Sequence, residues 1–237
     1  MNHDSISLGT WLSIGSPVIA ELASLAGFDW VLLDLEHGCV SEASLPHQLR
    51  ALKGSSTRSI VRVGAPYPDL IARVLDWGAD GIMVPRVESA ATASDVVKAA
   101  CHAPKGKRGF SRTVRATNYG LGSHPGEPHL MAQIETVAGV AAAPAIAAVE
   151  GITTLFVGPA DMRHDLEHSS SLELTDYDSC LDQILGAARD AGKEAGILVR
   201  DSADLSRHAE RGFSRLAVDS DLAILRQAYQ TLVSQKP

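Results

Sequence analysis

Short apolar runs alternate with amphipathic segments along almost the whole chain. The runs are rich in Val, Ile and Leu, and continuous runs of this kind are typical of parallel strands that are buried on both faces. An early segment, GTWLSIG around Trp11, begins the series. Seven more candidate strands follow, at residues 30–35, 59–63, 81–85, 130–135, 154–158, 195–199 and 215–218. The pattern therefore predicts eight strands.

The segments between the runs have helical spacing. In PVIAELASLAG, apolar residues recur at Val18, Leu22 and Leu25, and Gly27 is a typical helix stop. Similar segments lie at residues 69–78, 89–100, 136–149, 174–192, 201–212 and 220–233. Alternation of strand and helix predicts an α/β fold with a parallel sheet. Eight such units in 237 residues favour a closed TIM (β/α)8 barrel, a single domain spanning residues 1–237.

Two stretches interrupt the alternation. Residues 103–128 are rich in Gly, Pro and Arg and are too long for an idle connection, so we expect a loop over an active site or a subunit interface. Residues 162–176 form a polar insertion after the sixth strand, and His164 to His168 match the H-x-x-E-H pattern of inverted zinc proteases. That motif needs a long helix, which the surrounding sequence does not indicate. We interpret the insertion as a solvated, partly helical loop.

The net charge and the spacing of the cysteines indicate which binding partners and which cellular compartment to expect. The net charge is −7 and no long basic run occurs, which argues against nucleic acid and anionic membrane surfaces as partners. No apolar run approaches the roughly 20 residues that span a bilayer. The three cysteines are far apart and form no CxxC, and no signal peptide is indicated. We therefore expect a reduced, cytoplasmic protein that acts on a small molecule.

Polar residues gather where the predicted strands end. In TIM barrels the reactive side chains lie at the C-terminal ends of the strands and in the loops that follow. Here those positions hold Asp34, Glu36, His37, Arg62, Arg86, Gln133, Glu135 and the run Gly158-Pro159-Ala160-Asp161. The coincidence of these residues at one rim predicts an active site there.

Two of these residues, Glu135 and Asp161, are carboxylates at the ends of neighbouring strands. Adjacent carboxylates repel each other unless a proton or a cation lies between them. An oxygen-only site of this kind suits Mg²⁺ or Mn²⁺. The alternative is that each carboxylate pairs with a nearby Arg, and the sequence leaves both interpretations open.

Three further residues also have two interpretations. His37 follows two acids, so it is either a proton-transfer group or a loop histidine bonded to the backbone. Arg62 is placed within a strand, where it either pairs with a carboxylate or binds an anionic substrate. Trp11 is either a pocket wall or part of the core.

Taken in order, these motifs resemble a known family. GTWLSIGSPVIAELASLAGFDWVLLDLEHG, VRV, VLDWGADGIMVPRV, PKGKRG, QIET and FVGPADM are similar to the HpcH/HpaI aldolases, in the superfamily that includes citrate lyase β-subunits. The resemblance runs from about Leu8 to Val218. The segment after GPAD departs from the usual family pattern, and His102-Ala103-Pro104 replaces a common aromatic-Pro-Pro.

The resemblance implies an activity and roles for individual residues. Members are class II, metal-dependent pyruvate aldolases that cleave a 4-hydroxy-2-oxo acid, such as a 2-keto-3-deoxy sugar acid or a 4-hydroxy-2-oxo diacid, to pyruvate and an aldehyde. Glu135 and Asp161 would bind the metal, which would be Mg²⁺, Mn²⁺ or Co²⁺. Arg62 would stabilise the enolate, and His37, oriented by Asp34, would belong to an acid/base relay. The remaining positions would contribute to the metal shell, the pyruvate carboxylate site and the pocket wall: Gln133, Gly158, Pro159, Ala160 and Trp11.

The resemblance also implies a homo-hexamer in which a C-terminal helix is exchanged between neighbouring subunits. Two other functions stay open at this point. One is an acyl-CoA lyase of the citrate lyase β-like branch, for which the chain offers basic residues only at Arg108, Arg112 and Arg115. The other is a non-catalytic barrel that binds an oxo acid.

Overall fold

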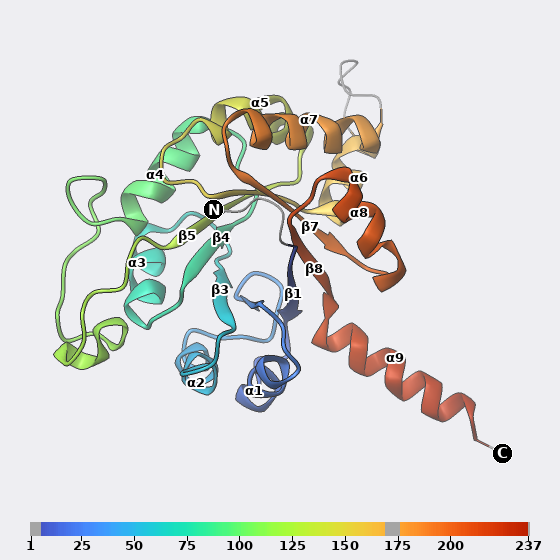
Figure 1. Cartoon of the computed structure of the whole chain (residues 1–237), viewed down its shortest axis with the longest axis horizontal. Helices are drawn as coiled ribbons and strands as arrows, with labels where there is room; N and C mark the ends of the chain where they lie inside the picture. The colour runs from blue at the N-terminus through green and yellow to red at the C-terminus, as the bar shows by residue number, and fades with distance from the viewer. Residues whose placement is uncertain (1–5, 169–175, 237) are drawn as a thin grey trace.

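The structure is a computed structural model that describes residues 6–168 and 176–236. Within these ranges, eight parallel strands follow one another around a closed barrel, and β1 pairs with both β2 and β8 (Figure 1). The strands are β1 Ser7–Leu12, β2 Trp30–Asp34, β3 Arg58–Arg62, β4 Gly81–Val84, β5 His129–Ile134, β6 Thr154–Val157, β7 Glu194–Val199 and β8 Arg215–Ser220. The predicted TIM barrel is confirmed.

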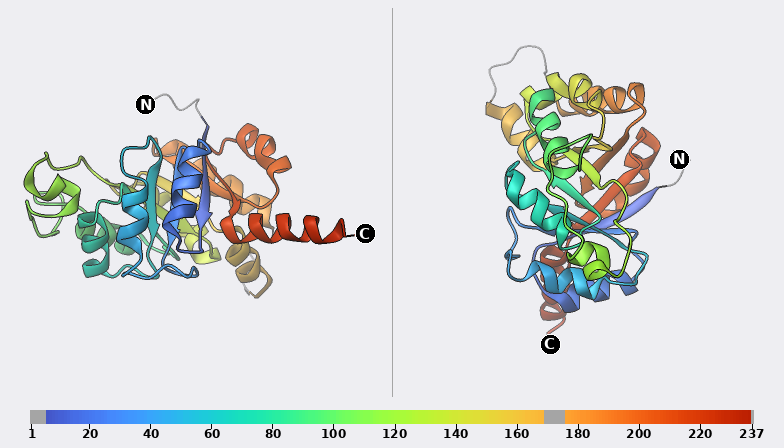
Figure 2. Two further views of the ribbon diagram at one scale, coloured as in Figure 1. Left: turned by 90° about the horizontal axis from the view of Figure 1, so that it is seen from below. Right: turned by 90° about the vertical axis from the view of Figure 1, so that its left-hand side faces the viewer.

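Helices surround the barrel (Figures 1 and 2). In the described part of the chain they are α1 Pro17–Leu25, α2 Leu45–Ala51, α3 Pro68–Asp76, α4 Ala90–Ala100, α5 Val137–Ala147, α6 Pro159–His168, α7 Tyr177–Asp190, α8 Leu205–Arg211 and α9 Asp221–Ser234. Two short 3₁₀ helices, η1 Arg115–Gly120 and η2 Ser202–Asp204, complete the list. The apolar spacing predicts all of the α-helices except α2 and α6.

Both unpredicted helices carry a weak apolar pattern. Helix α2 has seven residues, of which Leu45 and Leu49 are its buried apolar positions. Helix α6 buries Met162 and is otherwise largely polar. The first part of the polar insertion, residues 162–168, is therefore helical and largely exposed, in agreement with the predicted partly helical, solvated segment. Residues 169–175 of that insertion lie outside the described residues, and so do the first two residues of the predicted helix at 174–192.

The strands alternate between two cores, which explains their continuous apolar sequence. Residues that point outward, such as Val31, Leu33 and Val61, pack in the large core beneath the helices. Residues that point inward form a second core inside the barrel: Trp11, Trp30, Leu32, Ile60, Met83, Met131, Phe156 and Ala217. Each strand is therefore buried on both faces.

The inward columns become polar towards the C-terminal ends of the strands. On β2 the column runs Trp30, Leu32 and then Asp34, and on β3 it runs from Ile60 to Arg62. The pairing of Asp34 with Arg62 is part of the regular parallel register. On β5 the same period of two leads from Met131 to Gln133 and Glu135. Strand geometry alone thus directs these side chains into one end of the barrel.

The long segment 103–128 lies at the other end of the barrel. It connects the end of α4 to the start of β5, and it extends away from the barrel at the left of Figure 1. Arg115 in this segment donates to the backbone oxygens of Leu49 and Trp77, at the C-terminal ends of α2 and α3. The expectation of a loop over the chain's own active site is therefore wrong. Its alternative, a subunit interface, stays a prediction.

Helix α9 projects beyond the barrel (Figures 1 and 2). Its outer side chains include exposed Leu222, Tyr229, Leu232 and Val233. None of the helices in the described part of the chain combines the length and the apolar character that crossing a bilayer requires.

Candidate active site

Arg62 is the centre of a buried ion-pair network at the C-terminal end of the barrel. Its Nε donates to Asp34 Oδ1 at 2.9 Å and its Nη2 donates to Asp34 Oδ2 at 2.7 Å, which is a bidentate pair. Nη1 lies 2.9 Å from Oε2 of Glu36. Burial alone lowers the pKa of Arg62, but the bonds to Asp34 and the charge of Glu36 outweigh it and leave the pKa raised. Arg62 is therefore a fixed, permanently charged guanidinium.

His37 lies at the mouth of the same site. Its side chain is 67% exposed, and its Nε2 lies 3.9 Å from Oε2 of Glu36. Asp34 Oδ1 accepts from the backbone N–H groups of Glu36, at 3.0 Å, and of His37, at 3.3 Å. Asp34 thus fixes the turn that carries His37, whereas the carboxylate nearest to the imidazole belongs to Glu36. This differs from the expectation that Asp34 orients the ring directly.

Glu135 follows β5 and is almost fully buried. Its Oε1 accepts from the backbone N–H of Arg86 at 2.8 Å, and its Oε2 accepts from Nε2 of Gln133. Arg86 has a positive φ of 49°, in the left-handed region that residues other than glycine rarely adopt. The turn after β4 therefore holds a strained conformation that directs its amide at Glu135, and such strain is concentrated at functional sites.

Asp161 approaches Glu135 from the first turn of α6. The turn between β6 and α6 passes so close to Glu135 that a Cβ on Gly158 would collide with Oε2 of Glu135 and Nε2 of Gln133. A larger residue at position 158 would therefore displace the side chains of Glu135 and Gln133. The N-terminal amides of α6 lie at the same turn, and free amides at a helix N-terminus favour the binding of anions.

The carboxyl group of Glu135 is strongly perturbed. Burial raises its pKa from 4.5 to about 7, and the charges of Asp161 and Glu36 add to the effect. Burial also raises the pKa of Glu36. A buried carboxyl group whose pKa is raised by burial and by neighbouring negative charges is one that a bound cation would stabilise in its ionised form.

The structure bears on the alternative that Glu135 and Asp161 each pair with an Arg. Among the described residues, neither carboxylate forms an ion pair. Arg62 is committed to Asp34 and Glu36, while the side chain of Arg86 turns to Glu88. In addition, Oε1 of Gln133 is buried without a hydrogen-bond partner among the described residues. The donor set fits a hard divalent cation with oxygen ligands.

A cavity of about 210 Å³ brings most of the expected site residues together. Glu36, Arg86 and Glu135 are not part of the lining, although a Cβ on Gly158 would meet Glu135 directly. The expected residues that do line the cavity are Trp11, Asp34, His37, Arg62, Gln133, Gly158, Pro159, Ala160 and Asp161. Ser13, Leu198, Arg200 and Ser220 also line the cavity, and the sequence analysis does not identify any of them as site residues. All but Leu198 are polar residues at the ends of β1, β7 and β8, so the strand-end rule could have found them.

Trp11 has both of the roles that the sequence left open. Its ring packs against Trp30 and Phe156 in the inner core, with ring centroids 6.3 Å and 5.6 Å away. The guanidinium of Arg62 lies 5.6 Å from the centre of the ring, on the side of the cavity. Trp11 is therefore the top layer of the barrel core and the floor of the site.

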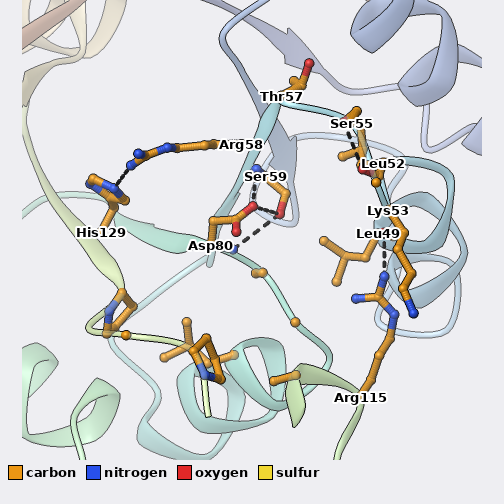
Figure 3. A pocket seen from close by; sticks show the side chains of 18 of the residues that line it. Leu49, Leu52, Lys53, Ser55, Thr57, Arg58, Ser59, Asp80, Arg115 and His129 are labelled. Atoms are coloured by element: carbon orange, nitrogen blue, oxygen red, sulfur yellow. Dashed lines mark hydrogen bonds between the residues drawn. The ribbon is translucent and has the colours of Figure 1, made fainter. Parts of the chain in front are cut away.

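A larger cavity, of about 440 Å³, lies at the opposite end of the barrel (Figure 3). Its polar groups are bonded to one another: Arg58 contacts His129, Asp80 accepts from Ser59, and Arg115 donates to backbone oxygens. Arg108 is paired with Asp76 at 2.5 Å. Arg108 and Arg115 are two of the three basic residues that the acyl-CoA lyase alternative offers for binding a nucleotide. Both are bonded to other groups of the chain, at the end of the barrel opposite Glu135 and Asp161. We therefore place the chemistry at the smaller cavity.

The chain is similar to known aldolases over most of its length. The model of the HpcH/HpaI aldolase/citrate lyase family matches residues 7–228. The chain is 37% identical over 232 residues to the 5-keto-4-deoxy-D-glucarate aldolase of Klebsiella pneumoniae, with 96% of this chain and 91% of that relative covered.

Solved structures are similar over almost the whole chain. A HpcH/HpaI aldolase/citrate lyase family protein from Burkholderia cenocepacia has a TM-score of 0.90 and 32% identity, covering 98% of this chain and 95% of that one. A HpcH/HpaI aldolase from Desulfitobacterium hafniense has a TM-score of 0.89 and 27% identity, covering 99% and 95%.

Proposed function

Because this chain belongs to the HpcH/HpaI aldolase/citrate lyase family, we propose that it cleaves a 4-hydroxy-2-oxo acid with a second, distal carboxylate into pyruvate and an aldehyde. The chain is an aldolase, a carbon–carbon lyase. The observation that carries the proposal is the convergence of Arg62 with two carboxylates, Glu135 and Asp161, that no arginine neutralises among the described residues.

The half of the substrate that becomes pyruvate fits the inner part of the cavity. The carboxylate at C1 is an anion, and the amides at the start of α6, at Ala160 and Asp161, suit it. The C2 oxygen becomes negative when the C3–C4 bond breaks. Arg62 is fixed by Asp34 and Glu36 before the substrate arrives, so it stabilises that oxygen without reorganisation.

Glu135 and Asp161 would hold a divalent cation, with Gln133 beside them. Mg²⁺, Mn²⁺ and Co²⁺ all accept such oxygen donors. When bound, the cation supplies Lewis-acid polarisation of the C2 carbonyl. Glu135 contributes only when ionised, so its raised pKa couples cation binding to the loss of a proton.

His37 is positioned to move the proton of the C4 hydroxyl. The imidazole at the cavity mouth accepts that proton, the C4–O bond becomes a carbonyl and the C3–C4 bond breaks. The bonding electrons pass to C3 and the C2 oxygen, where Arg62 receives the charge. The imidazolium of His37 then gives up its proton to C3, which completes pyruvate and restores the neutral imidazole. Glu36, 3.9 Å from Nε2 of His37, stabilises the imidazolium between these steps.

The outer part of the cavity suggests which substrates are preferred. Arg200 lies in the cavity lining and is mostly exposed, with Nη1 3.3 Å from Oδ1 of Asp219. Ser13 and Ser220 lie in the same lining. A cation and two hydroxyl groups suit the distal carboxylate of a sugar diacid, and the relative from Klebsiella is named for such a substrate. We therefore assign Arg200 to the distal carboxylate.

The proposal also includes the oligomeric state of the protein and its cellular compartment. Helix α1 presents Val18, Leu22 and Leu25 on one exposed stripe, while α9 projects with an apolar stripe of its own. We propose that α9 of one subunit covers α1 of a neighbour within a homo-hexamer. The three cysteines are free, which suits a reducing, cytoplasmic compartment.

The test is pyruvate release from two 4-hydroxy-2-oxo sugar acids that differ only in whether the far end is a carboxylate or a hydroxymethyl group. We expect metal-dependent release with the diacid preferred. Arg200→Met should raise KM for the diacid by about tenfold and leave KM for the monoacid nearly unchanged, since one charge-assisted hydrogen bond is lost. Arg189→Met, an exposed arginine on α7, is the control. Failure of both substrates to release pyruvate would refute the proposal.

A further inference from the structure

The last turn of α6 carries a cluster of potential metal ligands outside the active site. His164, Glu167 and His168 each offer one ligand atom, and these three atoms all lie within 4.8 Å of one another. The three side chains are exposed. The two histidines are four residues apart, so they lie on the same face of the helix, one turn from each other.

The helix that carries this cluster is held firmly by other side chains. Met162 is fully buried, and Leu166 packs against the large core. Asp165 Oδ2 accepts from the backbone N–H of Val137 at 2.7 Å, which ties α6 to the start of α5. Arg163 lies over the ring of Tyr177, 3.9 Å from its centre. The last turn of α6 is thus held in place before a metal binds. The positively charged side chain of Arg163 points towards Tyr177 at the start of α7.

The orientation of His168 also suits a ligand. Its Nδ1 lies 2.7 Å from the backbone oxygen of His164, so Nδ1 donates and Nε2 is left with a lone pair. Metal-binding histidines usually have this arrangement, in which one ring nitrogen donates to a carbonyl and the other binds the metal. The two imidazole rings lie close together, with centroids 4.3 Å apart.

From this geometry we propose that His164, Glu167 and His168 form an accessory site for a borderline divalent transition metal such as Zn²⁺. Two imidazoles and one carboxylate satisfy three positions of a tetrahedral ion, and water completes the fourth. Such a donor set binds Zn²⁺, Co²⁺, Ni²⁺ or Cu²⁺ in preference to Mg²⁺. Glu167 is here a ligand rather than the general base of a protease.

The accessory site is separate from the carboxylate pair. On the same helix, His164 is three residues beyond Asp161 and His168 is seven residues beyond it, which is about 5 Å and about 10 Å along the axis. The lining of the active-site cavity extends to Asp161 and does not include the cluster. The proposal therefore stands whether or not Glu135 and Asp161 hold a metal.

The experiment is equilibrium dialysis of chelator-treated protein against Zn²⁺ or Mn²⁺, followed by elemental analysis. We expect the wild-type chain to bind two Zn²⁺ ions and one Mn²⁺ ion. The His164→Ala/His168→Ala variant should keep one Zn²⁺, and Glu135→Gln should lose Mn²⁺ but keep the accessory Zn²⁺. Each single histidine variant should weaken accessory Zn²⁺ binding by at least about tenfold, as for other losses at a metal site.

A second histidine pair provides the matched control. His102 and His124 also face each other, with their Nε2 atoms 2.8 Å apart, but within residues 6–168 and 176–236 no carboxylate joins them in a metal-ligand cluster. His102→Ala/His124→Ala should therefore bind two Zn²⁺ ions. Unchanged Zn²⁺ stoichiometry and affinity in the His164→Ala/His168→Ala variant would overturn the proposal. Mn²⁺ retained by Glu135→Gln would contradict the active-site assignment alone.

Discussion

At the scale of one residue, Arg62 is a cation whose orientation is fixed by its neighbours before any substrate binds. Its guanidinium makes two parallel hydrogen bonds with Asp34 and a third contact with Glu36, and these protein contacts alone fix its plane. A lysine would keep the charge but could not make the bidentate contact. We expect Arg62→Lys to lower kcat by about 10²-fold, the typical effect of removing one oxyanion donor. Steady-state kinetics measure this, and near-normal turnover would show that Arg62 only supports the fold.

Glu135 should make stability depend on pH. Its pKa is raised from 4.5 to about 7 in the folded chain. Between these values the unfolded chain ionises while the folded chain keeps its proton, so stability falls as pH rises and the full cost is present above pH 7. The difference between the two pKa values, about 2.5 units, corresponds to at most about 3.5 kcal/mol.

Glu135→Gln removes that cost while keeping an acceptor for the amide of Arg86. In chelator, we expect the variant to be more stable than the wild type at pH 8, with little difference near pH 4.5. Urea unfolding at several pH values measures the difference. Excess Mn²⁺ should reverse the order at pH 8, because only the wild type binds the ion. Parallel stability curves for the two proteins would contradict the assigned environment of Glu135.

At the scale of elements, the turn between β6 and α6 positions Asp161, one of the two proposed metal ligands. Gly158 allows the backbone to pass against Glu135 and Gln133, where a Cβ would collide with both. We expect Gly158→Ala to lower kcat/KM by at least about 10²-fold with the barrel intact, since displacements near 1 Å at a site have effects of that size. Circular dichroism and kinetics measure the two parts. Gly126→Ala, where a Cβ meets nothing within 4 Å, is the control.

The elements also show which parts of the fold the sequence can predict. All eight strands are evident because burial on both faces requires continuous apolar runs. Helices α2 and α6 are missed because one is short and the other is polar. The polar strand ends indicate Asp34, Arg62 and Glu135, whereas the position of loop 103–128 depends on chain connectivity around the barrel.

The pairing of side chains within the site is harder to predict. The family resemblance implies that Asp34 orients His37, but the register of β2 with β3 places Asp34 opposite Arg62. Glu36 takes the position nearest to the imidazole instead. Neither the strained backbone of Arg86 nor its bond to Glu135 has a signal in the sequence, because both arise from the meeting of separate strands.

At the scale of the whole molecule, α9 tests the proposed assembly. Leu232 and Val233 are 65% and 71% exposed, although both are large and apolar. If the proposed hexamer forms through α9, Leu232→Asp/Val233→Asp should convert it into smaller species, because charges cannot enter an apolar interface without cost. Light scattering after gel filtration measures the mass, with Gln230→Asp on the same helix as the control. A wild-type chain that is already monomeric would contradict the exchange of α9.

The central claim is that Glu135 and Asp161 hold a divalent cation beside Arg62 and so allow pyruvate to form its enolate. The most direct measurement is exchange of the C3 protons of pyruvate with D₂O, followed by NMR without any aldehyde present. We predict exchange with Mg²⁺ or Mn²⁺ that stops in EDTA and is absent from Glu135→Gln at any metal concentration. Exchange that continues in EDTA, or that Glu135→Gln retains, would contradict the claim.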